Sequence, residues 1–213
     1  METFSFARTL IYIHPELGGV ALLCGGISLT SNKGSTPHKK FGLLFYYTML
    51  SSALAALVIS FLPNHESAFL FSISLFSSYF IIIGYRAMKY KLRNINLRWD
   101  KILALCLIIT SMGMIAYPIF WERKINIILL VFGIAGLAFG LRDYHLFKQS
   151  KKLRKVWLRM HLGNMIGGYI AAVTAFIVVN DILPGVSGWF VPGVLGGFYI
   201  YYWLIKLKPE QNV

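Results

Sequence analysis

Lys101-Ile-Leu-Ala-Leu-Cys-Leu-Ile-Ile-Thr-Ser-Met-Gly-Met-Ile-Ala-Tyr-Pro-Ile-Phe120 contains no charged residue after its first position. A helix of this length, rising about 1.5 Å per residue, crosses the roughly 30 Å of hydrocarbon in a lipid bilayer. The stretch is about twice as long as the roughly 10 residues of a barrel strand. A helix is then the remaining way to satisfy the main-chain polar groups in lipid. The stretch therefore predicts a transmembrane helix.

Further apolar segments of similar length lie on both sides of this one. The 213 residues are 57% apolar and 14% charged, which leaves too little polar surface to cover a soluble core. We expect an all-α membrane protein, a seven-transmembrane helix bundle that forms a single transmembrane domain over 1–213. The predicted helices lie near 10–30, 40–62, 67–87, 101–120, 125–145, 160–180 and 186–206.

The net charge of +13 follows from where the basic residues lie and does not indicate nucleic-acid binding. Of the 21 Lys and Arg residues, 18 lie in the first, third and fifth predicted loops and in the C-terminal tail. Because Lys and Arg concentrate on the cytoplasmic side, this distribution predicts the N-terminus outside and the C-terminus in the cytoplasm. The expected partner is the lipid bilayer, and the basic run 151–155 is a candidate for contacts with anionic lipid head groups.

Two groups of three predicted helices resemble each other in sequence. Gly19–Gly26 aligns with Gly133–Gly140, and further along His38 aligns with His161. These matches predict a 3+1+3 parallel internal repeat, with repeats over 9–90 and 124–208 and a linker helix over 101–120. The alternative is chance similarity, because apolar helices rich in Gly, Ala and Leu always align to some degree.

Glycine pairs four residues apart recur in the second half of the chain. Each pair lies on one face of its helix, which predicts close packing against a neighbouring helix in lipid. The alternative is that these smooth faces slide during transport. The pairs are Gly136 with Gly140, Gly163 with Gly167, and Gly193 with Gly197.

Histidines at the predicted cytoplasmic helix ends are the candidates for metal or haem binding. Imidazole and carboxylate groups suit a divalent metal, and a paired His38 and His161 would hold a haem iron from two sides. The spacing forms no local metal motif, so structural roles at helix ends are the alternative. The candidate metal residues are His38, His145, His161 and Asp143.

A second group of candidates lies on the predicted outer side. His14 and Glu16 lie inside the first span on either side of Pro15, and ionisable residues there usually face a cavity. The alternative is a shallow first helix that leaves both residues among the lipid head groups. The predicted ligand-binding residues of a polar cavity between the repeats are His14, Glu16, Asn164, Asn180 and Asp181, with Thr174 as a further lining residue.

Three motifs carry a resemblance to a known family. They are Pro37-His-Lys-Lys-Phe-Gly42-Leu-Leu-Phe-Tyr46, Gly84-Tyr-Arg-Ala87 and the segment 159–180. The chain resembles an uncharacterised family of small multi-pass bacterial membrane proteins, in which a histidine followed by basic residues and glycine opens a helix. The resemblance implies a bacterial plasma (inner) membrane and no established activity. Lys40 and Leu43 stand where arginines are frequent in such proteins.

Three classes of function remain open from the sequence. The leading hypothesis is small-molecule binding or transport through a polar cavity between the repeats. The alternative is a haem- or metal-binding membrane oxidoreductase that uses the cytoplasmic-side histidines. The second alternative is a non-catalytic subunit of a larger membrane complex, with a membrane-protein partner or as a homo-oligomer. No catalytic motif establishes an enzyme, and no P-loop indicates intrinsic use of ATP.

Overall fold

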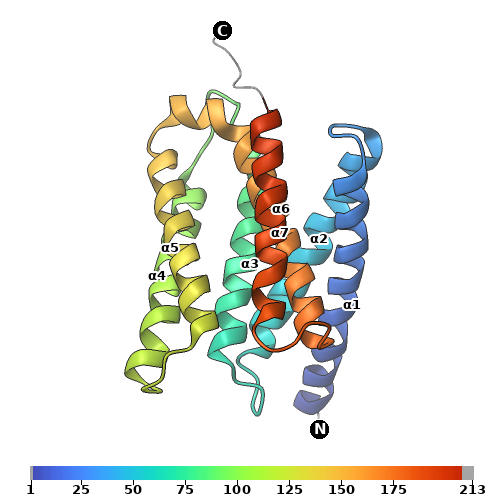
Figure 1. Cartoon of the computed structure of the whole chain (residues 1–213), viewed down its shortest axis with the longest axis vertical. Coiled ribbons are helices and arrows are strands. Elements are labelled where there is room, and N and C mark those ends of the chain that lie inside the picture. The colour runs from blue at the N-terminus through green and yellow to red at the C-terminus, as the bar shows by residue number, and fades with distance from the viewer. Residues whose placement is uncertain (1, 208–213) are drawn as a thin grey trace.

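A computed structural model of the chain describes residues 2–207, with side chains from residue 7 onward. This range is all helical, without a strand, and its seven helices are each long and apolar enough to cross a membrane (Figure 1). The predicted all-α, multi-pass bundle is therefore confirmed. In chain order the helices are α1 (Glu2–Thr30), α2 (Thr36–Ile59), α3 (Ala68–Ala87), α4 (Arg98–Phe120), α5 (Ile127–Phe147), α6 (Ser150–Val179) and α7 (Ser187–Lys206).

The bundle consists of two helix pairs on either side of a central group. α1 packs along α2 on one side, and α4 packs along α5 on the other (Figure 1). Between them α3 packs against α6, and α7 packs along the outside of α6. The start of α1 and the end of α7 lie at opposite ends of the bundle, as an odd number of spans requires. The internal repeat remains a prediction. Its proposed equivalent helices α1 and α5 have different main neighbours, since α1 packs along α2 and α5 packs along α4.

Local side chains determine where several helices begin. A Ser or Asn at the N-cap accepts a hydrogen bond from a main-chain N–H three residues later, which satisfies one of the unpaired donors of the first turn. The Ser35 hydroxyl accepts from the main-chain N–H of His38 at 3.4 Å, and the Ser67 hydroxyl accepts from that of Leu70 at 3.0 Å. The Asn126 side-chain oxygen accepts from the main-chain N–H of Leu129 at 3.1 Å.

α6 begins ten residues earlier than the hydropathy of the sequence predicts. Its first turns are amphipathic, because Leu153 and Met160 are buried in the core while Lys151 and Lys155 are exposed. A search for uncharged segments finds only the membrane-spanning part of such a helix. α1 is continuous through Pro15.

Small residues allow close approach of the helices in the core. A Cβ atom at Gly84 of α3 would lie 3.0 Å from the main-chain nitrogen of Met165 in α6. In α5, Gly136 faces the Ser111 side chain of α4 with no space for a Cβ atom, and Gly140 lies against the Ala104 carbonyl. The predicted packing role is confirmed for this glycine pair, which holds α5 against α4.

Two reciprocal histidine–serine clasps join α1 and α2. At one end His38 Nδ1 donates to the Ser28 carbonyl at 3.0 Å, and Ser28 Oγ donates to the His38 carbonyl at 3.1 Å. At the other end His14 Nδ1 donates to the Ser52 carbonyl at 2.9 Å, and Ser52 Oγ donates to the His14 carbonyl at 2.9 Å. Each clasp satisfies polar groups inside the membrane while fixing the register of two antiparallel helices.

The same short motif builds both clasps. His-x3-Gly-x9-Ser occurs over 14–28 and again over 38–52, and each motif supplies the histidine of one clasp and the serine of the other. Gly42 leaves room for a serine hydroxyl, since a Cβ atom there would lie only 3.1 Å from Ser28 Oγ, whereas a Cβ atom at Gly18 would be in ordinary contact with Ser52 Oγ at 3.5 Å. His14 and His38 therefore have equivalent contacts within the α1–α2 pair.

Replacing either clasp serine with alanine is expected to destabilise the bundle modestly. Ser28→Ala and Ser52→Ala should each lower the free energy of unfolding by about 0.6 to 1.7 kcal/mol, the range found for hydrogen bonds between membrane helices. The two losses should add, because four helical turns, about 21 Å, separate the clasps. Unfolding in mixed micelles with SDS, followed by circular dichroism, measures both. Exposed Ser51→Ala is the control, and an equal loss there would contradict the clasps.

Candidate functional site

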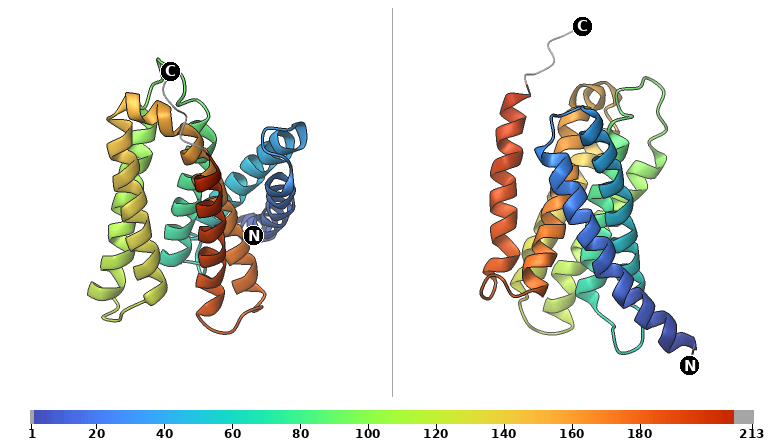
Figure 2. Two further views of the ribbon diagram at one scale, coloured as in Figure 1. Left: turned by 45° about the horizontal axis from the view of Figure 1, so that its top comes forward. Right: turned by 90° about the vertical axis from the view of Figure 1, so that its right-hand side faces the viewer.

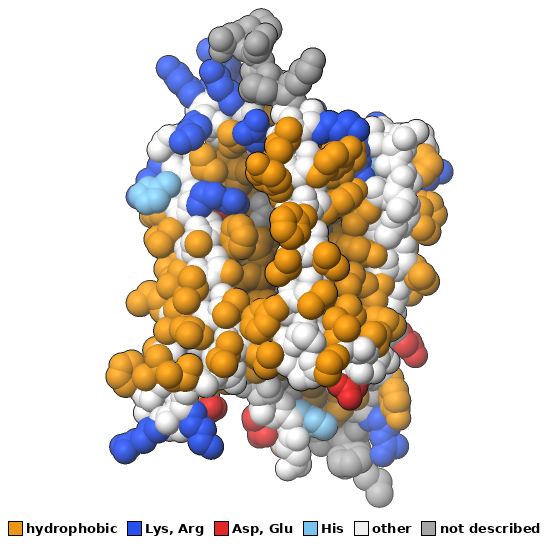
Figure 3. All heavy atoms as spheres, in the orientation of Figure 1, with side chains coloured by type: hydrophobic (Ala, Val, Ile, Leu, Met, Phe, Trp, Pro, Cys, Tyr) orange, Lys and Arg blue, Asp and Glu red, His pale blue; other side chains and the backbone are white. Residues whose placement is uncertain are grey.

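A cavity of about 1000 Å³ lies between α5, α6 and α7, with α3 behind it. The space-filling view shows the surface hollowed between α5 and α7, so the cavity opens on the side of the bundle (Figure 3). Side chains do not close it, because Gly163, Gly193 and Gly197 line it and a Cβ atom at each would meet nothing within 4 Å. The predicted packing role is therefore wrong for the pair on α7, whose glycines face open space.

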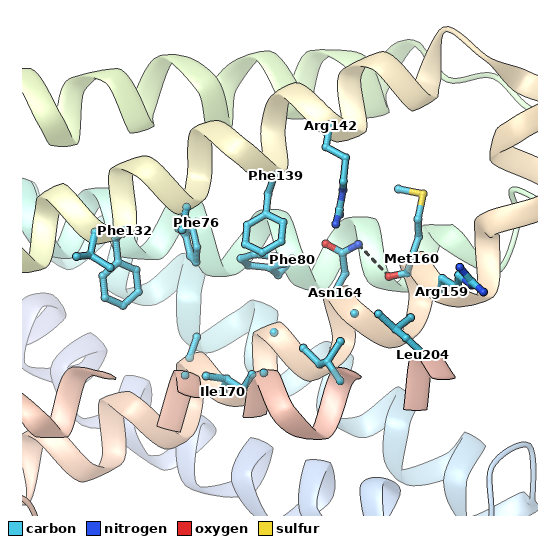
Figure 4. A pocket seen from close by; sticks show the side chains of 18 of the residues that line it. Phe76, Phe80, Phe132, Phe139, Arg142, Arg159, Met160, Asn164, Ile170 and Leu204 are labelled. Atoms are coloured by element: carbon cyan, nitrogen blue, oxygen red, sulfur yellow. Dashed lines mark hydrogen bonds between the residues drawn. The ribbon is translucent and has the colours of Figure 1, made fainter. Parts of the chain in front are cut away.

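Aromatic rings from α3 and α5 form a continuous wall of the cavity. Neighbouring rings lie in edge-to-face contact, a favourable arrangement for aromatic pairs. The centroid distances are 5.6 Å for Phe132 and Phe76, 4.7 Å for Phe76 and Phe80, and 5.2 Å for Phe80 and Phe139. Figure 4 shows these rings following one another toward Arg142. Trp189 of α7 joins this wall at the opposite end, 6.5 Å from Phe132.

Basic and polar side chains surround the other end of the cavity. Arg142, Lys152 and Arg159 line it there, together with His145 and Gln149. No Asp or Glu is among the described lining residues. The Arg142 guanidinium lies 5.1 Å from the centre of the Phe139 ring and also pairs with Asp143 at 2.8 Å. The cavity thus changes from aromatic to positively charged along its length.

Asn164 is a deeply buried polar residue of the site. Its side chain lines the cavity at a residue exposure of 1%, and its Nδ2 donates to the Met160 carbonyl at 2.9 Å (Figure 4). Its Oδ1 has no hydrogen-bond partner among the described residues. Exchanging the two amide atoms would place oxygen against the Met160 carbonyl, so the orientation is fixed. The cavity therefore contains a buried acceptor that lacks a donor.

The other predicted ligand-binding residues lie elsewhere. His14 is held in its clasp with Ser52, and Glu16, Asn180 and Asp181 are exposed outside the cavity lining. Asn164 alone of the five lines the cavity, along with Thr174. The structure thus separates the predicted outer group from the cavity.

The predicted metal residues do not form one cluster. Among residues 2–207, no group of three or more His, Cys, Asp or Glu side chains is placed to hold a metal ion. His38 is in its clasp, His161 Nδ1 donates to the Gly84 carbonyl at 2.8 Å, and His145 lies at the basic end of the cavity. Asp143 is fully buried, where its two oxygens accept from Tyr79 at 2.8 Å and Arg142 at 2.9 Å.

A second buried carboxylate lies at the same end of the bundle. Asp100 is fully buried and accepts two hydrogen bonds from Arg86, at 2.7 and 2.6 Å. Tyr90 donates to the same carboxylate at 2.5 Å, and burial raises the pKa of the Tyr90 phenol far above its ordinary value, which keeps it a donor. In the sequence, Arg86 and Asp100 look like ordinary charged residues of a loop. Nothing in the sequence indicates that they form a buried ion pair.

Comparison with known proteins adds no analogy for this site. The sequence matches no protein-family model, and comparison with curated proteins and with solved structures found no match. The site is therefore interpreted from its own geometry. Most of this site cannot be recognised in the sequence, because Phe76 with Phe80 and Gly193 with Gly197 have the same four-residue spacing as ordinary packing faces.

Proposed function

We propose that the protein binds a small molecule in this cavity, as a binding protein or carrier within the membrane. The unpartnered Oδ1 of Asn164 supports this most directly. Leaving a buried acceptor without a donor costs about 1–3 kcal/mol, which a ligand N–H or O–H would recover. The cavity volume is also at the upper end of the roughly 300–1,000 Å³ of typical ligand sites. The ligand is mostly apolar, because rings and aliphatic side chains dominate the lining.

We also propose that the basic end of the cavity faces the cytoplasm of a bacterial plasma membrane. The support is the concentration of Lys and Arg at the end where α7 finishes (Figure 3) and the tendency of cytoplasmic loops to be basic. This orientation places the N-terminus outside. The cavity then opens toward lipid on its side and toward the cytoplasmic head groups at its basic end.

The variant Asn164→Leu tests small-molecule binding. We expect the wild-type protein, purified in mild detergent, to retain a bound molecule in native mass spectra. The occupancy should fall at least about tenfold in the variant, equivalent to losing one hydrogen bond of about 1.4 kcal/mol. Its free energy of unfolding should stay unchanged or rise, because the variant no longer buries an unpaired acceptor. A purely structural asparagine would instead lose stability.

Asn180→Leu is a matched control on the same helix. Asn180 Nδ2 donates to the Phe176 carbonyl at 2.8 Å, as Asn164 does to Met160, but Asn180 is exposed and outside the cavity lining. This control should keep the bound molecule. Loss of the ligand in Asn180→Leu, with retention in Asn164→Leu, would contradict the proposal and favour the predicted outer site.

A further inference from the structure

The distance from the far end of the aromatic wall to the charged end of the cavity is close to the thickness of one bilayer leaflet. Phe132 and Arg142 are ten residues apart on α5, a rise of about 15 Å, which is half of the roughly 30 Å hydrocarbon thickness. Across the cavity, Ile170 of α6 and Val194 of α7 present aliphatic surface. An extended hydrocarbon chain from one leaflet therefore matches this part of the cavity in length and polarity.

The positive charge at the end of this wall is only partly compensated. Lys152 and Arg159 form no ion pair among the described residues, and Arg142 is paired only with Asp143. Among the residues that the structure describes, no Asp or Glu lines the cavity to repel an anion. Arg and Lys together are the usual ligands of phosphate groups in proteins. The basic end thus complements a phosphate placed where the hydrocarbon chain ends.

The buried acceptor lies just below the charged end. Asn164 follows Arg159 by five residues on α6, about 7.5 Å closer to the bilayer centre. A hydroxyl next to the phosphate of a lipid would reach this depth and donate to the Asn164 Oδ1. Head group, hydroxyl and hydrocarbon chain then follow in the order in which the cavity presents cations, acceptor and rings (Figure 4).

Access from the lipid agrees with the position of α7. This helix packs along α6 at the margin of the bundle, as the right-hand view of Figure 2 shows. The opening between α5 and α7 faces the side of the bundle, where lipid chains lie. A molecule already inserted in the leaflet can therefore enter without passing through water.

We propose that the cavity binds an anionic single-chain lipid, with its phosphate at Lys152 and Arg159, a hydroxyl at Asn164 and its hydrocarbon chain along the rings from Phe139 to Phe132. This inference rests on the proposed function and names its ligand class. Lipids and water-soluble metabolites can both carry a phosphate ester. We infer that the phosphate ester bound here belongs to a lipid.

Competition against radiolabelled 1-oleoylglycerol 3-phosphate on the purified full chain in mild detergent tests the ligand class. The competitors are the uncharged 1-oleoylglycerol, which lacks the phosphate, and glycerol 3-phosphate, which lacks the chain. We expect the complete lipid to bind at least about tenfold more tightly than either part. Lys152→Gln combined with Arg159→Gln should reduce its preference over 1-oleoylglycerol to about twofold or less. The control Lys151→Gln with Lys155→Gln changes two exposed lysines outside the lining and should keep the preference.

Each of the other possible outcomes contradicts a defined part of this proposal. Equal affinity for 1-oleoylglycerol overturns the phosphate site, and tight binding of glycerol 3-phosphate alone overturns the hydrocarbon site, while small-molecule binding stands in both cases. If none of the three binds but the wild-type protein retains another molecule that Asn164→Leu loses, the lipid class is wrong and the proposed function stands. If the protein also retains no molecule, both fail.

Discussion

Replacing Arg86 with methionine is expected to lower the free energy of unfolding by about 3–5 kcal/mol, the usual cost of leaving one partner of a buried ion pair alone. Asp100 has a side-chain exposure of 0%, whereas the Arg86 side chain is 25% exposed. The variant therefore leaves the carboxylate inside the bundle with Tyr90 as its remaining donor. SDS-induced unfolding of purified protein measures the change.

Two further variants identify the cause of this loss. The double variant Arg86→Met with Asp100→Leu should recover most of the stability, because no buried charge remains. Asp100→Asn alone should cost less than Arg86→Met, since the partly exposed Arg86 can still be hydrated. If the double variant is as unstable as Arg86→Met, the loss comes from packing, and the ion-pair explanation is wrong.

Filling the cavity is expected to abolish lipid binding without unfolding the protein. Gly193→Leu combined with Gly197→Leu adds two side chains to the α7 wall, where neither Cβ atom meets an obstacle. Leucine is also the better helix former by up to about 1 kcal/mol per position, so stability should not fall. The affinity for 1-oleoylglycerol 3-phosphate should drop by about 100-fold or more, equivalent to about 2.7 kcal/mol. Competition binding and SDS unfolding measure the two effects.

Gly113→Leu is the matched control for this pair. Gly113 on α4 also has open space around its Cβ position, but it lies outside the cavity lining. This variant should bind the lipid like the wild-type protein. Full binding by the filled variant would show that the lipid contacts another surface.

The sequence predicts the helices well because the bilayer imposes their length. The predicted ends lie within about three residues of the observed helix ends throughout. The predicted starts are wrong at α1 and α6, because these two helices begin before their apolar segments. Hydropathy identifies only the apolar segment of such a helix. At α6 the spacing of Leu153 and Met160 among lysines is the signal of an amphipathic turn.

The site was less predictable, because its residues look the same in sequence as packing residues. Gly136 with Gly140 and Gly193 with Gly197 have the same spacing, yet the first pair contacts α4 and the second faces the cavity. Only the three-dimensional position of the neighbouring helix distinguishes them. The sequence instead predicts ligand binding by ionisable residues such as His14. In the structure His14 is part of a clasp between α1 and α2.

Photo-crosslinking tests lipid binding in the cavity most directly. The probe is 1-oleoylglycerol 3-phosphate with a diazirine in its hydrocarbon chain, and mass spectrometry of peptides locates the labelled residues. We expect labelling at cavity residues such as Phe132, Phe139 and Ile170, and its loss in the variant with Gly193→Leu and Gly197→Leu. Labelling confined to outward-facing residues such as Leu23 of α1 and Ile109 of α4, unchanged in that variant, would contradict the proposed site.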